Sequence, residues 1–397
     1  MENKNETLVT FMEQETSESD KPPSTRPRPA RHWRVAVIAN VKGKSTPTLV
    51  NAIDAGAEFD KRETIEAIQA AIESDGHSTT FLQADTTLPH ALREVCPDIC
   101  FNIAEGLGGD AREAQVPALL EMMHIPYTAS RVLANALGLD KTMTKRVWRD
   151  SGLPTAPFQE FVTGNEPLSP EMTFPMFVKP AREGTGMGMD EGSIVHDKSA
   201  LYNRVAWVIQ TYQQPALVET YLPGREFTVG VIGRHDAPLF SRKPKYYHPD
   251  GFLRLPVLEV DNHNTATPGV YGYLTKTLHN GDEGVPNFLC PAPIDEELTA
   301  RLQELAIRAH QSLGALDVSR VDIRLDANGS PCLLEINTLP GLSPGFSDLC
   351  VIANAFGWSY QDLILEILYL GASRYGLLQT AEPIHLTSLR TLVSIPG

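Results

Sequence analysis

The spacing of apolar residues alternates between strand-like and helix-like in the first third of the chain. Three runs rich in β-branched residues predict strands: WRVAVIAN at 33–40, STTFLQA at 78–84 and PDICFNIAE at 97–105. Three segments have apolar residues at helical spacing: 63–74, 88–95 and 112–123. Strands that alternate with helices predict a parallel sheet, in which ligand-binding loops follow the carboxyl ends of the strands. The loop 104–110 occupies such a position.

The pattern changes in the rest of the chain. Residues 130–151 predict helix, and FPMFVKP at 174–180 predicts a strand before a glycine-rich stretch. From Ala216 onward, short runs separated by turn residues suggest an antiparallel sheet: 216–222, 225–233, 237–244 and 252–260. Helical patterns then flank a predicted hairpin at 320–337, and their ranges are 295–314 and 359–372.

Composition limits the partners of the chain. It has 397 residues, 42% hydrophobic and 21% charged, which is typical of a globular protein with two or three domains. A formal net charge of −15 disfavours nonspecific binding to nucleic acid or anionic membranes, so we expect a small-molecule partner. Residues 1–31 predict a disordered tail rather than a secretory signal, and no apolar run is long enough for a transmembrane helix. These features indicate a cytoplasmic protein.

Five cysteines, an odd number spread along the chain, indicate a reducing compartment rather than a disulfide framework. Cys96 and Cys100 flank a proline in an apolar segment, and we expect both in the core. Metal ligation is the alternative for this pair, but partner residues at zinc-finger spacing are missing.

Asp322 and Glu335 stand in two short, largely apolar runs of the predicted hairpin RVDIRLDANGSPCLLEIN at 320–337. If Asn328-Gly329 is a two-residue type I′ turn, residue 322 pairs with 335 and residue 320 with 337. Alternation then places six side chains on one face of the sheet: Arg320, Asp322, Arg324, Leu333, Glu335 and Asn337. Directly opposed acids are destabilising and require a counter-charge. Either the arginines supply it or a divalent cation such as Mg²⁺ does.

A glycine-rich loop follows a lysine in FVKPAREGTGMGM at 177–189. Backbone N–H groups of such a loop can bind phosphates, with the ammonium of Lys179 as a point charge beside them. The spacing fits neither a Walker loop nor a Rossmann fingerprint. Further on, Glu219 and Glu226 stand on either side of a Pro-Gly turn. Their carboxylates could accept ribose hydroxyls or an adenine amine, and a solvated hairpin tip is the alternative.

These motifs, in this order, resemble the ATP-grasp superfamily and in detail the D-alanine–D-alanine ligase family. The strongest stretches are IPYTAS at 125–130, LGLDKTMTKRVWRDSGLPTAP at 137–157, FVKPAREGTGMGM at 177–189, GREFTVGVIG at 224–233 and RVDIRLDANGSPCLLEINTLPGL at 320–342. The resemblance implies an α/β fold in which a parallel-sheet domain precedes two domains that clamp ATP. It predicts five parts: a tail at 1–31, an N-terminal α/β domain at 32–130, a central domain at 131–215, a C-terminal catalytic domain at 216–375 and an extension at 376–397.

The resemblance also implies roles for individual residues. The ATP-binding set is Lys141, Lys179, Glu183, Gly184, Thr185, Gly186, Glu219, Leu222, Glu226 and Lys276. The implied ligands for two Mg²⁺ ions, or Mn²⁺, are Asp322, Glu335 and Asn337. Arg320, the backbone of Gly341 and Lys276 are implied to stabilise negative charge that develops during catalysis. The implied reaction joins a carboxylate to an amine through an acyl phosphate.

The amino-acid pocket departs from the usual wording of the family. Glu105 stands where the family commonly has a histidine, and Thr277 where it usually has a tyrosine that closes the site. Either Ser343 or Ser347 receives the carboxylate of the second substrate, and either Glu58 or Asp60 anchors the first amine. An acid at position 105 favours a nearby cationic group or free amine.

We therefore predict an ATP-dependent carboxylate–amine ligase whose substrates are other amino acids or related small molecules. The alternatives are a true D-alanine–D-alanine ligase of cell-wall synthesis and a non-catalytic nucleotide-binding module. We expect small-molecule substrates, no nucleic acid and no membrane as partners. The resemblance to the family suggests a homodimer.

Overall fold

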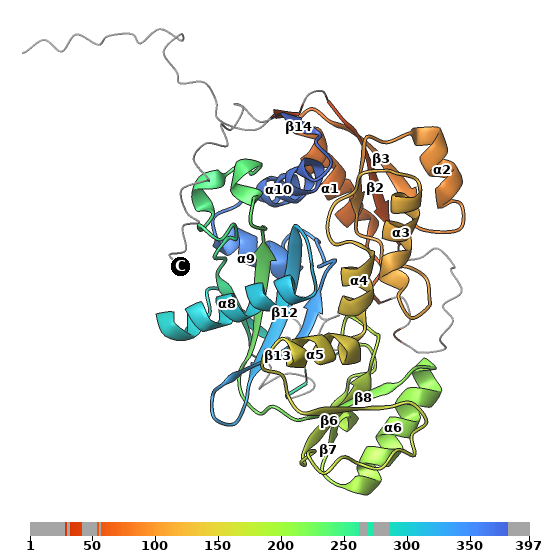
Figure 1. Cartoon of the computed structure of the whole chain (residues 1–397), viewed down its shortest axis with the longest axis vertical. Helices are drawn as coiled ribbons and strands as arrows, with labels where there is room; N and C mark the ends of the chain where they lie inside the picture. The colour runs from red at the N-terminus through yellow and green to blue at the C-terminus, as the bar shows by residue number, and fades with distance from the viewer. Residues whose placement is uncertain are drawn as a thin grey trace, which may run out of the picture.

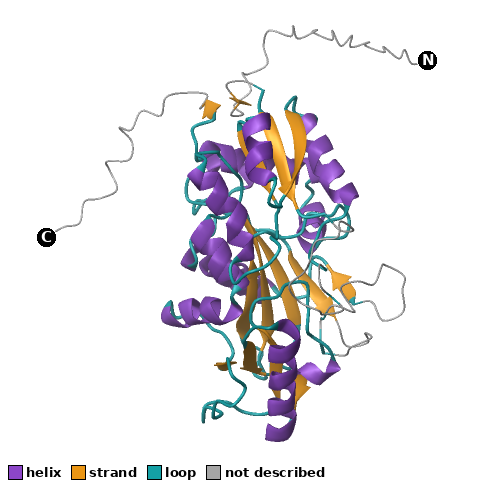
Figure 2. Cartoon of the chain, turned by 90° about the vertical axis from the view of Figure 1, so that its right-hand side faces the viewer, coloured by secondary structure: helices purple, strands orange, loops and turns teal. Residues whose placement is uncertain are grey.

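Three sheets of three or more strands follow one another along the long axis of the molecule (Figures 1 and 2). The computed structural model describes residues 28–29, 32–41, 54, 57–261, 269–270, 272 and 286–379. A parallel sheet lies at one end, a four-stranded antiparallel sheet at the other, and a five-stranded antiparallel sheet between them. The fold is therefore mixed α/β, as the sequence predicted.

The parallel sheet has the order β3-β2-β4, with β2 at Arg34–Ala39, β3 at Ser78–Gln83 and β4 at Ile99–Asn102. Its helices are α1 (Arg62–Glu73), α2 (Leu88–Val95) and α3 (Gln115–Met122). From Val35 to Ala39, strand β2 is apolar because both of its faces are buried. Val35 and Val37 pack with α1 and with α10 (Tyr360–Ser373), whereas Ala36 and Ile38 pack with α2 and α3. The predicted strands, helices and parallel order are confirmed here.

The four-stranded sheet has the order β5-β8-β6-β7. Its strands are β5 (Phe158–Phe161), β6 (Met176–Pro180), β7 (Ile194–Val195) and β8 (Ala216–Thr220), and α6 (Lys198–Tyr212) packs on it. The sequence pattern grouped residues 216–222 with the strands that follow them, and that grouping is wrong. Hydrogen bonds to β5 and β6 place β8 in this sheet, because alternation along a strand does not reveal its neighbours.

The five-stranded sheet has the order β11-β10-β9-β12-β13. Its strands are β9 (Glu226–Ile232), β10 (Val257–Asp261), β11 (Asn287–Leu289), β12 (Val318–Leu325) and β13 (Pro331–Asn337). Helix α8 (Glu296–Ser312) packs on one face, and α9 (Asp348–Ala355), which the sequence did not suggest, packs against β9 and β10.

Two predicted strands in this region are wrong in whole or in part. In place of the predicted strand at 237–244 there are short 3₁₀ turns at Ala237–Leu239 and Pro244–Tyr246, each with proline in its first turn. Proline has no N–H for a sheet ladder, which explains why this run is not a strand. In the predicted strand 252–260, regular pairing begins only at Val257.

The predicted helix at 130–151 is two helices, α4 (Val132–Leu139) and α5 (Lys141–Asp150). Asp140 separates them because its extended backbone ends α4 while its carboxylate accepts a hydrogen bond from Met143 N at 2.9 Å, which caps α5. The cap fixes where the first turn of α5 begins, and therefore where Lys141 lies.

The hairpin pairs Asp322 with Glu335 and Arg320 with Asn337, as predicted, but its turn is different. Strand β12 ends at Leu325 and β13 begins at Pro331, and between them Asp326 accepts hydrogen bonds from Asn328 N and Ser330 N, each at 2.8 Å. The two-residue turn was therefore wrong, because a local side-chain acceptor favours a longer one.

A register shift in the hairpin compensates for the longer turn. Ile323 pairs with Leu333, so the shift lies between this pair and the pair formed by Asp322 and Glu335. The bulge restores the register at the acids and turns Leu333 into the core beside Ile323. The prediction that Leu333 shares the face of the acids was wrong.

The ends and the cysteines complete the fold. Strand β1 (Arg28–Pro29) pairs with β14 (Leu378–Gln379), and the other residues of the predicted tail, like 380–397, lie outside the described residues. None of the helices in the described ranges is both long and apolar enough to cross a membrane. All five cysteines are unpaired; Cys100 is buried as expected, but the expectation for Cys96 was wrong, since it is exposed at the left-handed C-cap of α2.

A buried ion-pair group joins the parallel sheet to the C-terminal helix. Asp317 is fully buried, accepts a hydrogen bond from Ala129 N at 3.0 Å and pairs with Arg374 at 3.1 Å and Arg234 at 3.3 Å. Arg374 also donates to the carbonyl oxygens of Tyr127 and Ala129. Three distant segments therefore depend on one carboxylate.

We predict that Asp317→Ala lowers the free energy of unfolding by about 3–5 kcal/mol, because it leaves two arginines in the interior without their counter-charge. Chemical denaturation followed by circular dichroism measures the change. Asp150→Ala, at an exposed helix end, is the control and should change stability by less than about 0.5 kcal/mol. Equal effects of the two substitutions would contradict the role of Asp317.

Candidate active site

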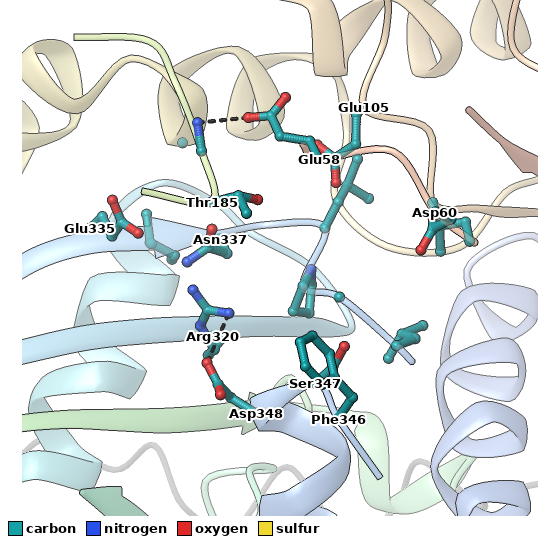
Figure 3. A pocket seen from close by; sticks show the side chains of 18 of the residues that line it. Glu58, Asp60, Glu105, Thr185, Arg320, Glu335, Asn337, Phe346, Ser347 and Asp348 are labelled. Carbon is teal, nitrogen blue, oxygen red and sulfur yellow. Dashed lines mark hydrogen bonds and ion pairs between the residues drawn. The ribbon is translucent and has the colours of Figure 1, made fainter. Parts of the chain in front are cut away.

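A cavity of about 490 Å³ lies where the N-terminal region, the glycine-rich loop and the hairpin meet (Figure 3). Three groups of predicted site residues line it: Glu58, Asp60 and Glu105; Glu183, Gly184 and Thr185; and Lys141, Arg320, Glu335, Asn337, Gly341 and Ser347. These residues come from distant parts of the chain, and the fold brings them to one space. In Figure 3, Glu58 and Glu105 lie on the side opposite Phe346 and Ser347.

A second cavity, of about 60 Å³, lies between the two antiparallel sheets. Among its lining residues are the predicted nucleotide contacts Lys179, Glu219, Leu222 and Glu226, together with Asp322. Glu335 lines both cavities, so the hairpin acids stand where the two spaces adjoin. An elongated ligand could extend from one cavity into the other past these carboxylates.

Glu219 lies between two lysines. Its carboxylate is 2.5 Å from Nζ of Lys145 and 2.6 Å from Nζ of Lys179, and all three residues are buried. Burial acts to raise the pKa of Glu219, but the two ammonium groups hold it below its ordinary value. The alternative interpretation from the sequence, in which Glu219 lies at a solvent-exposed hairpin tip, is therefore excluded.

The sequence reasoning missed Lys145. Its position four residues after Lys141 on α5 was the available signal, since residues at this spacing share one face of a helix. Burial lowers the pKa of Lys145, and Glu219 opposes that change. Lys145 also donates to Thr155 Oγ1 at 2.6 Å and to the carbonyl oxygen of Leu333 at 3.1 Å, which joins α5 to the hairpin.

Each hairpin acid has a basic partner. Asp322 accepts hydrogen bonds from Arg320 at 3.0 and 3.1 Å and from Thr228 Oγ1 at 2.9 Å. Glu335 lies 3.4 Å from Nζ of Lys141. The neighbouring arginine was a correct source of counter-charge for Asp322, whereas the partner of Glu335 comes from α5, which hairpin register could not reveal.

The second predicted arginine does not balance the hairpin acids. Arg324 pairs with Glu226 at 3.5 Å, donates to the carbonyl oxygens of Gly224 and Gly269 at 3.1 and 3.0 Å, and stacks on Tyr221. Arg320 instead makes a second ion pair, with Asp348 at 3.2 Å. Arg320 is thus held from two sides, with its guanidinium directed at the cavity (Figure 3).

The hairpin oxygens suit a hard divalent cation. Asp322, Glu335 and Asn337 supply two carboxylates and an amide, the ligand types that Mg²⁺ prefers. Nδ2 of Asn337 is buried without a hydrogen-bond partner among the described residues, so this N–H donor is open to an acceptor such as water or a phosphate oxygen, whereas Oδ1 is the atom that would face a cation. No set of three or more His, Cys, Asp and Glu side chains in the described part forms a metal cluster by itself. A cation here would need further oxygens, such as those of a phosphate.

Two backbone amides of the glycine-rich loop hold carboxylates of the N-terminal segment. Gly184 N donates to Glu58 at 2.6 Å, and Gly188 N donates to Asp54 at 2.9 Å. A Cβ at position 184 would lie 2.5 Å from Oε1 of Glu58, so a larger residue here would have to displace this carboxylate. Thr185 and Gly186 both have positive φ, at 49° and 70°. The loop therefore binds anionic oxygens, which here are carboxylates.

Four acids lie close together on the N-terminal side of the cavity: Glu58, Asp60, Glu105 and Glu113. Arg112, which the sequence reasoning did not single out, binds Glu58 at 2.7 and 2.8 Å and Glu183 at 3.2 Å. Burial and the neighbouring carboxylates raise the pKa of Glu105 well above its ordinary value. Burial likewise raises the pKa of Glu113, another residue that was missed, to about 7.

The structure distinguishes the two candidate serines. Ser347 lines the cavity, and its Oγ accepts a hydrogen bond from Ser343 N at 2.9 Å. Ser343 does not line it, and its hydroxyl lies 2.6 Å from Oγ1 of Thr64. Gly341 lines the cavity beside Ser347, where a Cβ would come within 2.9 Å of Ser347 Oγ. Lys276 and Thr277 lie outside the described residues.

The fold belongs to the ATP-grasp class. A solved structure of the D-alanine–D-alanine ligase from Bacillus anthracis, complexed with ATP, superposes with a TM-score of 0.63 at 20% identity. The match covers 87% of this chain and 99% of that one.

Sequence comparison narrows the class to a family. The family model described as D-ala D-ala ligase C-terminus matches residues 147–369. The D-alanine–D-alanine ligase of Syntrophotalea carbinolica is 32% identical over 330 residues, 83% of this chain and 96% of its own. An uncharacterized protein of Sinorhizobium fredii is 33% identical over 318 residues, 78% of this chain and 88% of its own. The chain belongs to the D-alanine–D-alanine ligase family, whose members are ATP-dependent ligases.

The raised pKa of Glu113 predicts a pH dependence of stability. Below the ordinary pKa of about 4.5, both the folded and unfolded states hold the proton; between about 4.5 and 7, only the folded state does. The free energy of unfolding should therefore fall as pH rises through this range and level off above it. Glu113→Gln should remove this part of the dependence. The measurement is the denaturant midpoint of unfolding at pH 4.5, 5.5, 6.5 and 7.5. Glu171→Gln, at an exposed position, is the control. If wild type and Glu113→Gln show the same change of stability with pH, the prediction is wrong.

Proposed function

We propose that the chain is an ADP-forming ligase that joins a carboxylate to an amine at the expense of ATP. The observation that carries this proposal is the position of Asp322 and Glu335, opposed on one hairpin where two cavities adjoin, with Lys141 and Arg320 beside them. Such a group can hold a charged phosphate chain at one end and a reacting carboxylate at the other.

The smaller cavity is the proposed site of the nucleoside. Strand β8 and the residues after it form one wall, Glu226 offers an acceptor for ribose hydroxyls, and Lys179 supplies a positive charge at the phosphate side. The triphosphate would extend past Glu335 toward Lys141 and the glycine-rich loop. There it would compete with the carboxylates of Asp54 and Glu58 for loop amides, because these amides already hold anionic oxygens. The similar Bacillus anthracis ligase was solved in complex with ATP, which supports this assignment.

Mg²⁺ is the proposed metal, with Mn²⁺ as a substitute. Asp322, Glu335 and Asn337 would hold one or two ions, and the metal would neutralise charge on the phosphate oxygens. Lys141 and Arg320, now paired with Glu335 and Asp322, would remain close enough to share these anionic partners.

The proposed reaction has two steps that use the residues of the larger cavity. A substrate carboxylate oxygen attacks the γ-phosphorus of ATP, which forms an acyl phosphate and releases ADP. The nitrogen of a second substrate then attacks the acyl carbon, phosphate leaves, and the nitrogen loses a proton. Arg320 and the backbone N–H of Gly341 would stabilise the oxyanion of the tetrahedral intermediate. Lys276 remains a proposed partner of the phosphates.

The acids on the N-terminal side of the larger cavity, which we call the acidic wall (Glu58, Asp60, Glu105 and Glu113), favour substrates other than two alanines. Glu105 replaces the family's usual histidine and lies among carboxylates, and Ser347 is the better candidate for a substrate carboxylate because it lines the cavity. Glu58 is engaged with Arg112 and Gly184; Asp60 and Glu105 line the same cavity and are further candidates for the amine. True D-alanine–D-alanine ligation is the second candidate, supported by the named activity of the relatives.

Other expectations remain proposals of the same kind. They are the division into parts at 1–31, 32–130, 131–215, 216–375 and 376–397, a cytoplasmic location and a homodimer. The hydrogen bonds of β8 favour moving the boundary at 215 to a point after Thr220. A non-catalytic nucleotide-binding module is disfavoured because the hairpin retains both acids and Asn337.

Glu335→Gln tests the hairpin chemistry. The amide loses the charge that a metal and Lys141 require, so turnover should fall by about 100-fold or more, corresponding to about 2.7 kcal/mol. The measurement is ATP-dependent phosphate release, with unfolding curves to show that the variant is folded. Glu304→Gln, on the exposed side of α8, is the matched control and should retain activity. Unchanged turnover in Glu335→Gln would exclude a metal role for this residue.

A substrate panel tests the choice between the two ligase functions. Purified protein with Mg²⁺, ATP and single or paired D- and L-amino acids should release phosphate and ADP with substrates other than D-alanine, and mass spectrometry should detect the joined product. Release with D-alanine alone would establish the housekeeping activity instead. Hydrolysis that does not depend on any added amine or carboxylate would argue against ligation.

A further inference from the structure

Not all acids of the larger cavity are equally available to a ligand. Glu58 is occupied by Arg112 and Gly184, and Glu183 by Arg112 and Gln214. Glu105 and Glu113 also line the cavity, but neither side chain has a hydrogen bond or ion pair to any residue of the described ranges. Of these four acids, Glu105 and Glu113 are therefore the two whose carboxylates can still accept hydrogen bonds from a ligand.

The cavity offers these two acids no spare positive charge among its described lining residues. Its basic residues there are Lys141 and Arg320, and each already pairs with another acid: Lys141 with Glu335, and Arg320 with Asp322 and Asp348. Carboxylates removed from water without a partner either take up protons or bind a cation. Burial and neighbouring carboxylates raise the pKa of Glu105 and of Glu113, although the guanidinium of Arg112 opposes the rise at both and the ammonium of Lys141 opposes it at Glu113.

A bare metal ion is not the cation that fits best. A metal requires several ligands within about 2.0–2.6 Å of one point, and the described residues contain no cluster of three or more acidic, histidine or cysteine side chains with that geometry. An ammonium or guanidinium group can reach two carboxylates that are farther apart, since it is larger and donates several hydrogen bonds. It can also stay attached to a molecule that extends to the reaction centre.

The reaction centre opens into the same cavity as these acids. Arg320, Glu335 and Asn337 line it together with Glu105 and Glu113, and Figure 3 shows Glu105 beside Glu58, with Arg320 and Asn337 across the space. A substrate can thus place its reacting carboxylate near Arg320 while a second group of the same molecule lies against the acids. That second group must be cationic to match them.

We propose that Glu105 and Glu113 form a subsite for a side-chain cation of the substrate, so that one of the two joined molecules is a basic amino acid such as lysine, ornithine or arginine. The inference depends on the proposed ligase function and narrows its substrate class. It distinguishes this chain from a ligase of two alanines, which have no side-chain cation.

The test compares basic amino acids with neutral molecules of nearly the same shape. The full chain is assayed for ATP-dependent phosphate release with lysine against norleucine, and with arginine against citrulline, in D and L forms. We expect kcat/KM to be at least about tenfold higher for the basic member of a pair. Glu105→Gln and Glu113→Gln should each remove most of this preference without changing KM for ATP. Glu304→Gln, the exposed acid on α8, should keep it.

Three results would overturn the inference. The first is equal turnover of the basic and neutral members of each pair, which would leave the proposed ligase function standing. The second is a preference for the basic substrate that persists in the double variant with both Glu105→Gln and Glu113→Gln. The third is a loss of stability in these variants without a change in preference, which would assign the acids a structural role.

Direct binding separates failure of the subsite from failure of the ligase function. If no amino acid supports phosphate release, the ligase proposal fails, and calorimetric titration with lysine and norleucine still tests the subsite. Binding of lysine that is weakened at least about tenfold by Glu105→Gln supports it. Equal binding of lysine and norleucine refutes it.

Discussion

The structure of the site depends on one unfavourable arrangement, the direct opposition of Asp322 and Glu335 across strands β12 and β13. Like charges at paired positions destabilise a sheet, so positive charge must reach both. Arg320 supplies it to Asp322 from the same strand, and Lys141 supplies it to Glu335 from the first residue of α5. The same basic groups suit an anionic substrate. The positive charges of Arg320 and Lys141 thus offset the repulsion between the two acids, and the same charges would attract a phosphate.

The lysines of α5 connect this hairpin to the rest of the site. Lys141 pairs with Glu335, and Lys145, one turn later, pairs with Glu219 at the end of the four-stranded sheet, where Lys179 completes the group. The cap at Asp140 fixes where α5 begins, and therefore where Lys141 and Lys145 lie along the helix relative to their acidic partners. Because these residues are buried, each is held by a partner rather than by solvent, and loss of one charge leaves another without compensation.

The N-terminal region contributes mainly negative charge. Glu58 and Asp54 bind amides of the glycine-rich loop, and Arg112 joins Glu58 to Glu183. These contacts attach the parallel-sheet region to the glycine-rich loop, and in the proposed function a triphosphate would compete for the same hydrogen-bond donors. Further negative charge comes from Glu105, whose pKa is raised by burial and by neighbouring carboxylates.

The sequence by itself determined the parallel sheet, the long helices α1, α8 and α10, the family and the pairing of the hairpin acids. These features depend on local periodicity, or on motifs whose residues lie close together in the chain. The tertiary structure alone decided that β8 joins the four-stranded sheet, that a bulge buries Leu333, and that Lys145 and Arg112 hold Glu219 and Glu58. Such contacts join residues far apart in sequence, and neither hydrophobic spacing nor turn chemistry encodes which distant charge will compensate a buried acid.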